Sequence, residues 1–317
     1  MSKMTRKRAR IILFLILLFA FGFAVKDKPK APLLTRPELI KALPSLNSGV
    51  RVKRNIVWAV VDGERLTLDV FFPEEDGIYP MVVNIHGGGW TFGTKEMDEA
   101  LCRYLARRGY VIFNINYRLA PAHPFPAQVN DCLGAVMWSK DHSREYQADP
   151  NLVAVMGDSA GANLSAMVAF AYDYPEFKPT YRSETHNASA KAAVLIYGVY
   201  DMTRFYIPDT WGTPFAYSYL GGPPNFFPER YIKASPVRYI SPEKNPAIML
   251  VVGEKDTYFV DSVKFKEQIE RLGIRYRFYT AKGVGHAFIN LGFLKPTREA
   301  FEVIADFLDQ ELKGLKK

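Results

Sequence analysis

Apolar residues recur along this chain in short, nearly continuous runs, and the segments between the runs are long enough to form helices. Such runs are typical of strands that are buried on both faces, as in a parallel sheet covered by helices. The pattern therefore predicts an α/β fold with a mostly parallel central sheet. The runs lie at residues 81–85, 111–115, 152–156, 193–199 and 247–252.

An antiparallel pair of strands is predicted ahead of these runs. Residues 51–60 and 65–72 are strand-like, and the turn between them contains Asp62-Gly63, a common hairpin dipeptide. The chain has 317 residues, of which 48% are hydrophobic, and this is enough for one large core. We find no internal repeat of solenoid or propeller length. Residues 26–317 are therefore predicted to form one domain.

An uncharged apolar segment of fifteen residues, 11–25, lies between two basic clusters near the amino terminus. As a helix it would rise roughly 22 Å, against the roughly 30 Å of a bilayer core. It is either a signal peptide or a short membrane anchor. Its final residues match a signal-peptidase site poorly, which favours the uncleaved anchor. Five basic residues precede it and three follow it, so we expect an exported domain, anchored to the membrane or, after cleavage, secreted or periplasmic.

The net charge of +8 would by itself suggest a nucleic-acid partner. Residues 1–30, however, contain eight basic residues and one acidic residue, which leaves +1 for residues 31–317. We therefore expect no nucleic-acid binding surface on the main domain. Two cysteines, Cys102 and Cys132, lie in helix-like stretches, and the sequence leaves open whether they pair.

The first candidate for chemistry is a serine between two glycines. Gly-Asp-Ser-Ala-Gly at 157–161 follows the predicted strand 152–156 and precedes a helix-like stretch at 162–171. On such a sharp turn, side chains two positions on either side of the serine would collide with the neighbouring strand and helix, so only glycine fits. The helix also directs its first amide groups at the serine oxygen. This arrangement predicts that Ser159 is a nucleophile.

A run of three glycines follows another predicted strand. His-Gly-Gly-Gly-Trp occupies residues 86–90, directly after residues 81–85. Glycines leave their backbone amides uncovered, as an oxyanion hole requires. The alternative is an ordinary flexible loop. The order of the two motifs along the chain favours the oxyanion hole.

A third motif, Asn-Tyr-Arg-Leu-Ala-Pro-Ala-His-Pro-Phe-Pro-Ala at 116–127, completes the pattern. Together the motifs resemble the hormone-sensitive-lipase-like branch of the α/β-hydrolases, which includes bacterial carboxylesterases and arylacetamide deacetylases. The resemblance covers most of residues 50–312. It implies an α/β-hydrolase fold with helices on both faces of the sheet and a small cap. It also implies an oxyanion hole formed by the backbone amides of Gly88, Gly89 and Ala160.

In α/β-hydrolases an acid and then a histidine follow the serine in chain order. Only two histidines follow Ser159. His186 lies in a polar stretch that we expect to be a surface loop, whereas His286 lies on a glycine-bracketed loop beyond the strand-like residues 275–279. The resemblance therefore assigns His286 as the general base.

Three aspartates are candidates for the acid. Asp256 follows the run 247–252, at the carboxyl end of a predicted strand, where the sites of open α/β sheets gather. Asp261 is predicted to begin the helix 262–272 and to act as its N-cap. Asp201 ends another strand-like run and is a third candidate. The family pattern favours Asp256.

The remaining histidines have other expected roles. His86 and His123 precede the serine, so we interpret them as structural residues that hold loops by hydrogen bonds. His142 lies in a charged stretch and is expected to be solvated. No two histidines have the spacing of a metal-binding motif such as H-E-x-x-H. We therefore expect neither a metal nor another cofactor.

An aromatic-rich insertion at residues 201–240 interrupts the sheet pattern. In the family this region helps to form a cap over the active site, together with residues before the first strand, here about 30–49. We expect the aromatic residues to line an apolar acyl or alcohol pocket, although part of them could form the core of the cap. They are Phe205, Tyr206, Trp211, Phe215, Tyr217, Tyr219, Phe226, Phe227 and Tyr231.

Together these features predict a serine carboxylesterase that hydrolyses short- to medium-chain esters of small molecules through an acyl-enzyme intermediate. An amidase or deacetylase acting on arylamides or formamides would use the same residues. A lipase at the membrane surface and a non-catalytic binding protein on the same scaffold are further alternatives. The presence of Ser159, Asp256 and His286 disfavours the binding protein.

Overall fold

A computed structural model describes residues 49–205, 212–244 and 246–315. The predicted apolar segment 11–25 and nearly all of the predicted amino-terminal part of the cap, 30–49, lie outside these residues. Within the described ranges, none of the helices is long and apolar enough to cross a membrane.

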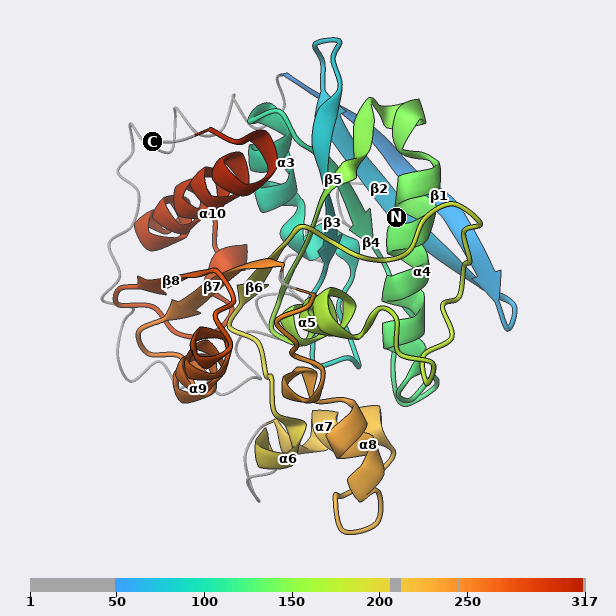
Figure 1. Ribbon diagram of the computed structural model, residues 1–317, viewed down its shortest axis with the longest axis vertical. Coiled ribbons are helices and arrows are strands. Elements are labelled where there is room, and N and C mark those ends of the chain that lie inside the picture. Colours follow the sequence, from blue (N-terminus) through green and yellow to red (C-terminus); the bar gives the residue numbers. More distant parts are fainter. Residues whose placement is uncertain (1–48, 206–211, 245, 316–317) are drawn as a thin grey trace, which may run out of the picture.

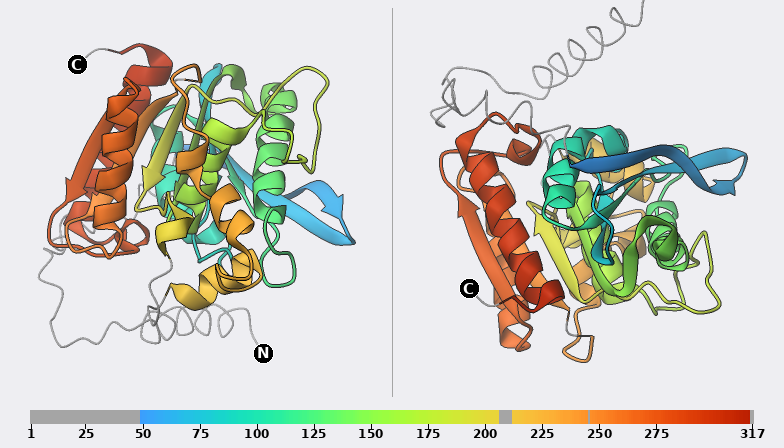
Figure 2. Two further views of the ribbon diagram at one scale, coloured as in Figure 1. Left: turned by 60° about the horizontal axis from the view of Figure 1, so that its bottom comes forward. Right: turned by 90° about the horizontal axis from the view of Figure 1, so that it is seen from above.

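The described residues form one eight-stranded sheet with the order β1-β2-β4-β3-β5-β6-β7-β8. The pairs β1–β2 and β2–β4 are antiparallel, and every other pair is parallel. Figure 2 shows the long β1–β2 hairpin extending beyond the rest of the molecule. The strands are β1 (Val50–Val61), β2 (Glu64–Pro73), β3 (Tyr79–Ile85), β4 (Val111–Ile115), β5 (Ala148–Asp158), β6 (Ala192–Ile196), β7 (Ala247–Gly253) and β8 (Tyr276–Ala281).

Helices cover both faces of the sheet (Figure 1). One core contains buried residues of α4, α5 and α9, and the other contains buried residues of α3 and α10. The α-helices are α3 (Glu99–Arg107), α4 (Ala127–Asp141), α5 (Ala160–Ala171), α6 (Met202–Phe205), α7 (Thr213–Leu220), α8 (Pro228–Lys233), α9 (Phe259–Arg271) and α10 (Lys295–Lys313). The 3-10 helices are η1 (Lys95–Asp98), η2 (Ser143–Tyr146), η3 (Pro236–Arg238) and η4 (Phe288–Asn290).

These features confirm the predicted α/β-hydrolase fold. Each predicted strand falls on an observed one, and Asp62-Gly63 forms the turn of the β1–β2 hairpin. The prediction for β6 was too long, since residues 193–199 were expected and the strand ends at Ile196. The next residue, Tyr197, has a positive φ of 41°, which turns the chain out of the strand direction.

The strand order brings two predicted motifs side by side. β3 lies between β4 and β5. The chain therefore continues from β3 to β4 on one side of β3 and then crosses to β5 on the other side. The carboxyl ends of β3 and β5 are paired, with Ile85 opposite Gly157. Such a reversal of strand order opens a crevice at the carboxyl edge of the sheet, where ligands of open α/β sheets bind. The glycine loop after β3 and the serine turn after β5 therefore share one crevice.

The cap helices α6, α7 and α8 lie together at one end of the molecule (Figures 1 and 2). Tyr219 of α7 stacks on Trp90 of the glycine loop, with ring centroids 4.5 Å apart. The Phe125 amide donates to the Tyr219 carbonyl at 2.8 Å, and the Asn163 side chain donates to the carbonyl of Ala234. These contacts attach the described part of the cap to the crevice.

Candidate active site

Ser159 lies on a sharp turn between β5, which ends at Asp158, and α5, which begins at Ala160. Its φ of 50° and ψ of −116° are unusual for a residue with a side chain. A Cβ atom at Gly161 would overlap the Ile85 carbonyl oxygen, and one at Gly157 would lie 2.5 Å from the same atom. The prediction that only glycine fits on either side of this serine is confirmed.

The structure brings Ser159, His286 and Asp256 together as one hydrogen-bonded chain. His286 Nε2 lies 2.9 Å from Ser159 Oγ, and His286 Nδ1 lies 3.0 Å from Asp256 Oδ2. The Asp256 side chain is fully buried, while that of His286 is 18% exposed. With Nδ1–H donating to the carboxylate, Nε2 can accept the serine proton, as a general base requires.

Two aromatic rings enclose the imidazole of His286. Tyr258 approaches it edge-on with ring centroids 5.1 Å apart, and Tyr197 lies 4.7 Å away by the same measure. The backbone amide of Tyr258 also donates to Asp256 Oδ1 at 2.8 Å. Neither tyrosine belongs to a motif that could be recognised in the sequence, although Tyr258 follows the candidate acid by only two residues.

The other candidate acids are engaged elsewhere. Asp201 accepts hydrogen bonds from Thr203 and pairs with Arg204. Asp261 accepts the Tyr200 amide at 2.7 Å, and burial raises the pKa of its carboxyl to about 7. The predicted N-cap role of Asp261 was wrong, because α9 begins earlier, at Phe259, with Tyr258 as its cap residue.

The glycine loop presents backbone amides to the crevice. Gly88 and Gly89 have positive φ angles of 110° and 55°, which side chains disfavour. Within the described ranges, neither amide donates to a protein acceptor. Ala160 is the first residue of α5, where helix amides lack intrahelical acceptors. These three amides are therefore available to a ligand, and their role in holding an oxyanion stays a prediction.

The remaining histidines contact loops. His86 is buried, its Nδ1 lies 2.7 Å from the Gly87 carbonyl, and burial lowers its pKa to about 4. His123 pairs with Glu64 at 3.0 Å, and His186 pairs with Asp141 at 2.7 Å. Both His86 and His123 thus make the kind of loop contact that was expected of them.

The expectation that His142 is solvated holds only in part, because the residue is half-buried. Its ring stacks on Trp138, with centroids 4.0 Å apart. Its Nδ1 lies 2.9 Å from the Trp138 carbonyl, one of the last carbonyls of α4. The same carbonyl accepts the backbone amide of His142 at 3.0 Å, so both the ring and the backbone of His142 contact the end of α4.

The described cap aromatics differ in burial, and Phe226, which was expected to line the pocket, is 72% exposed. Tyr219 and Tyr231 are fully buried and belong to the core, whereas Phe215 is only half-buried. Phe215 stands over the glycine loop, since a Cβ at Gly89 would lie 2.9 Å from its Cγ, and it contacts Phe92 with ring centroids 5.7 Å apart. Among the other predicted pocket residues, Tyr206 and Trp211 lie outside the described residues.

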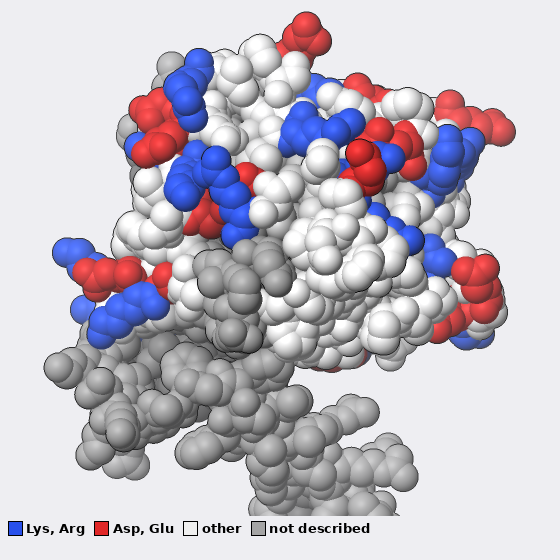
Figure 3. All heavy atoms as spheres, turned by 90° about the horizontal axis from the view of Figure 1, so that it is seen from below, with Lys and Arg blue, Asp and Glu red and all other residues white. Residues whose placement is uncertain are grey.

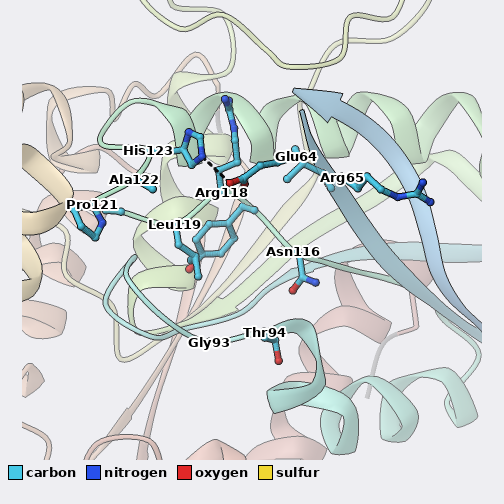
Figure 4. Close-up of a pocket in the computed structure, with 13 residues that line it drawn as sticks. Glu64, Arg65, Gly93, Thr94, Asn116, Arg118, Leu119, Pro121, Ala122 and His123 are labelled. Carbon is cyan, nitrogen blue, oxygen red and sulfur yellow. Dashed lines mark ion pairs between the residues drawn. The ribbon is translucent and has the colours of Figure 1, made fainter. Parts of the chain in front are cut away.

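A cavity of about 660 Å³ lies between the β1–β2 hairpin and the loops that follow β3 and β4 (Figure 4). Residues 64–66 of the hairpin, Gly93, Thr94 and residues 116–123 line it. None of Ser159, His286 and Asp256 lines the cavity, whereas Glu64 and His123, which pair with each other, both do. It is therefore distinct from the hydrogen-bonded chain of Ser159. Within the described ranges, no group of three or more His, Cys, Asp and Glu side chains could hold a metal ion.

A serine on a strained turn after β5, joined through histidine to a buried aspartate, defines the class of serine hydrolases with the α/β-hydrolase fold. The sequence matches the BD-FAE family profile over residues 68–269, and the chain belongs to that family.

The comparisons also confirm the resemblance to hormone-sensitive-lipase-like esterases. The probable carboxylic ester hydrolase LipM of Mycobacterium tuberculosis is 35% identical over 180 residues, which are 55% of this chain and 41% of LipM. Carboxylesterase NlhH of the same organism is 40% identical over 134 residues, or 41% of each chain. These matches span about two fifths of each relative's length. The hyperthermophilic esterase of Pyrobaculum calidifontis superposes with a TM-score of 0.70 at 27% identity, covering 86% of this chain and 89% of that one.

Proposed function

We propose that the protein is a serine carboxylesterase that hydrolyses short- to medium-chain esters of small molecules. The observation that carries the proposal is the hydrogen-bonded chain from Ser159 Oγ through His286 to Asp256. The names of LipM, NlhH and the Pyrobaculum esterase support the same activity.

The residues act in a fixed sequence. Ser159 Oγ attacks the ester carbonyl while His286 Nε2 takes its proton, and Asp256 orients the imidazole and stabilises its charged form. The amides of Gly88, Gly89 and Ala160 stabilise the negative charge that develops on the carbonyl oxygen. His286 then delivers its proton to the leaving alcohol, and water attacks the acyl-enzyme with His286 again acting as base.

The surroundings of the site suit an uncharged substrate. Phe92 and Phe215 supply half-buried apolar surface next to Gly89. On the end of the molecule shown in Figure 3, acidic and basic side chains are interspersed and uncharged surface covers much of the face. These features fit an ester with apolar acyl or alcohol groups better than a polyanion.

The test is hydrolysis of p-nitrophenyl esters from acetate to palmitate by the wild-type protein and by Ser159→Ala. We expect the highest kcat/KM on short or medium chains and its loss in the variant. A matched p-nitroanilide measures amide cleavage, and faster turnover of the anilide would identify an amidase. No turnover by folded protein, or turnover that survives the substitution, would contradict the proposal.

The proposal includes export of the domain and attachment to a membrane through residues 11–25. It is supported by the charge pattern of the sequence, in which five basic residues precede this segment and three follow it. The positive-inside rule then places the domain on the far side of the membrane. Fractionation of cells expressing the full chain, with protease added to intact cells, tests it. Full-length protein in the soluble cytoplasmic fraction would contradict it.

A further inference from the structure

Asp158, directly before the nucleophile, has a buried carboxyl group that takes no part in the proton transfers of the esterase reaction. The residue is 4% exposed. Its Oδ1 accepts the backbone amide of Gly87 at 2.7 Å, and its Oδ2 accepts the Tyr197 hydroxyl at 3.2 Å. Gly87 is 71 residues away in the sequence and begins the glycine loop. The carboxyl group therefore joins the serine turn to the loop that carries the candidate oxyanion donors.

This contact explains the first glycine of the loop. A Cβ at Gly87 would lie 2.7 Å from Asp158 Oδ2 and 2.9 Å from Oδ1, so a side chain there would displace the carboxyl group. Gly88 and Gly89 follow immediately and have no side chains that could fix the direction of their amides. Their orientation depends on where the chain is held on either side, and the Asp158 contact holds it at the residue directly before them.

The other end of the loop is held by separate contacts. The Ala120 amide donates to the Trp90 carbonyl at 2.9 Å. Further along the chain, Asp98 of η1 accepts hydrogen bonds from Asn84 and Asn290. Within the loop, the Gly87 carbonyl lies 2.7 Å from His86 Nδ1, and the Gly88 carbonyl accepts the amides of Thr91 and Phe92, each at 3.1 Å. Asp158 adds the contact that holds the Gly87 amide, directly before Gly88 and Gly89.

Tyr197, the second hydrogen-bond partner of Asp158, lies next to the general base His286. The Tyr197 ring packs against His286, with centroids 4.7 Å apart, and its backbone amide donates to the Val251 carbonyl. One buried carboxyl group thus contacts both a residue of the glycine loop and a residue that packs on the imidazole. Burial and the nearby Asp98 raise the pKa of Asp158 well above its usual range. An uncharged asparagine should therefore replace it with little disturbance.

We propose that Asp158 is a positioning residue that aims the oxyanion-binding amides of Gly88 and Gly89 by holding the amide of Gly87. The inference rests on the proposed esterase function. It requires that loss of the Asp158 contact weakens binding of the transition state and not binding of the substrate.

The experiment measures kcat, KM and the inhibition constant of a trifluoromethyl ketone for wild type, Asp158→Ala and Asp158→Asn. The ketone carries the best acyl chain and forms a reversible oxyanion adduct with Ser159. In Asp158→Ala we expect kcat to fall roughly 10²–10³-fold, as when one oxyanion donor is lost. KM should stay within about threefold, and the inhibition constant should rise in parallel with the loss of kcat/KM. Asp158→Asn should remain within about tenfold of wild type, since its amide can accept from Gly87 and donate to Tyr197.

The matched control is Asp131→Ala. Asp131 is also a buried carboxyl that accepts a backbone amide and side-chain donors, in this case from Arg118 and from the Thr180 hydroxyl. The Asp131→Ala substitution should lower the free energy of unfolding without a proportional change in the inhibition constant. If Asp158→Ala does not fold, Gly87→Ala perturbs the same contact from the other side and should show the same kinetic signature.

The outcomes separate the two claims. The wild-type protein must first be active. If kcat is then unchanged in Asp158→Ala, or if kcat falls in this variant while the inhibition constant is unchanged, the positioning role is overturned and the esterase function is left intact. Wild-type protein that hydrolyses no ester would overturn the proposed function and this inference with it.

Discussion

Ser159 illustrates how single residues of this site keep an unfavourable local conformation. Its φ of 50° belongs to a region that costs on the order of 1–3 kcal/mol for a residue with a side chain. The Ser159 amide donates to the Ile196 carbonyl at 2.8 Å, and α5 begins at the next residue. Because these contacts come from two elements, the serine cannot relax alone, and its hydroxyl stays directed at His286.

Substitution of single carboxyl groups tests the assignment of Asp256 as the acid that orients His286. Asp256→Asn should lower kcat by roughly 10⁴-fold, as loss of the acid does in other triads, because His286 loses the carboxylate that orients it. Asp201→Asn should leave kcat within about threefold, since Asp201 contacts Thr203 and Arg204 and not the imidazole. Steady-state kinetics on one p-nitrophenyl ester measures both. Equal losses in the two variants would contradict the assignment of Asp256.

Among the elements, α9 begins earlier than the sequence pattern predicts, and this changes the surroundings of Asp261. The helix begins two residues before Asp261, which places this carboxyl in the first turn, against the chain after β6. There it accepts the Tyr200 amide and is half-buried. The cost of burying the charged form therefore exceeds the stabilisation from this hydrogen bond.

This burial predicts a pH-dependent effect on stability. The carboxyl of Asp261 has a pKa of about 7 in the folded protein, against an ordinary value of 3.8. The folded state therefore binds the proton more tightly, and the contribution to stability is present below pH 4 and is lost as the pH rises to about 7. Asparagine does not ionise, so the Asp261→Asn variant does not lose this contribution as the pH rises. The unfolding free energy of Asp261→Asn relative to wild type should thus increase by about 3 kcal/mol from pH 5 to pH 8.

Chemical denaturation at the two pH values measures this difference. Asp76→Asn is the control, because the Asp76 side chain is 93% exposed, and its difference from wild type should stay constant with pH. A constant difference for Asp261→Asn as well would contradict the burial argument.

The elements also show what sequence patterns can predict. Strands buried on both faces produce runs such as residues 247–252, which are visible without tertiary information. The end of β6 was not predictable, because the positive φ of Tyr197 depends on its contacts with β7 and Asp158. The triad geometry was predictable through chain order and motifs. The role of Asp158 was not, since its partner lies 71 residues away and no local pattern connects the two.

At the scale of the whole molecule, the described residues form two cores, one on each face of the sheet, and each contains one of the two cysteines. Cys132 lies in the core with α4 and α5, and Cys102 lies in the core with α3 and α10. Both are free and fully buried. The sheet separates them, so they cannot form a disulfide within one folded chain. Burial also raises the pKa of both thiols, which suppresses the reactive thiolate.

Thiol titration tests this arrangement of the fold. Native protein should show no fast reaction with an aromatic disulfide reagent, because both thiols become accessible only when a core opens. In denaturant without reductant, two thiols per chain should react. Fast reaction of the native protein, or fewer than two thiols in denaturant, would contradict the two-core arrangement or the absence of a disulfide.

The central claim is that Ser159 is a nucleophile activated by His286 and Asp256. The most direct measurement is the intact mass of the protein after treatment with a fluorophosphonate, followed by peptide mapping, because this reagent reacts with activated serines irrespective of the natural substrate. We predict one adduct per chain, on Ser159, none in Ser159→Ala, and much slower labelling in His286→Ala. No adduct on folded protein, or an adduct on a residue other than Ser159, would contradict this assignment of the nucleophile.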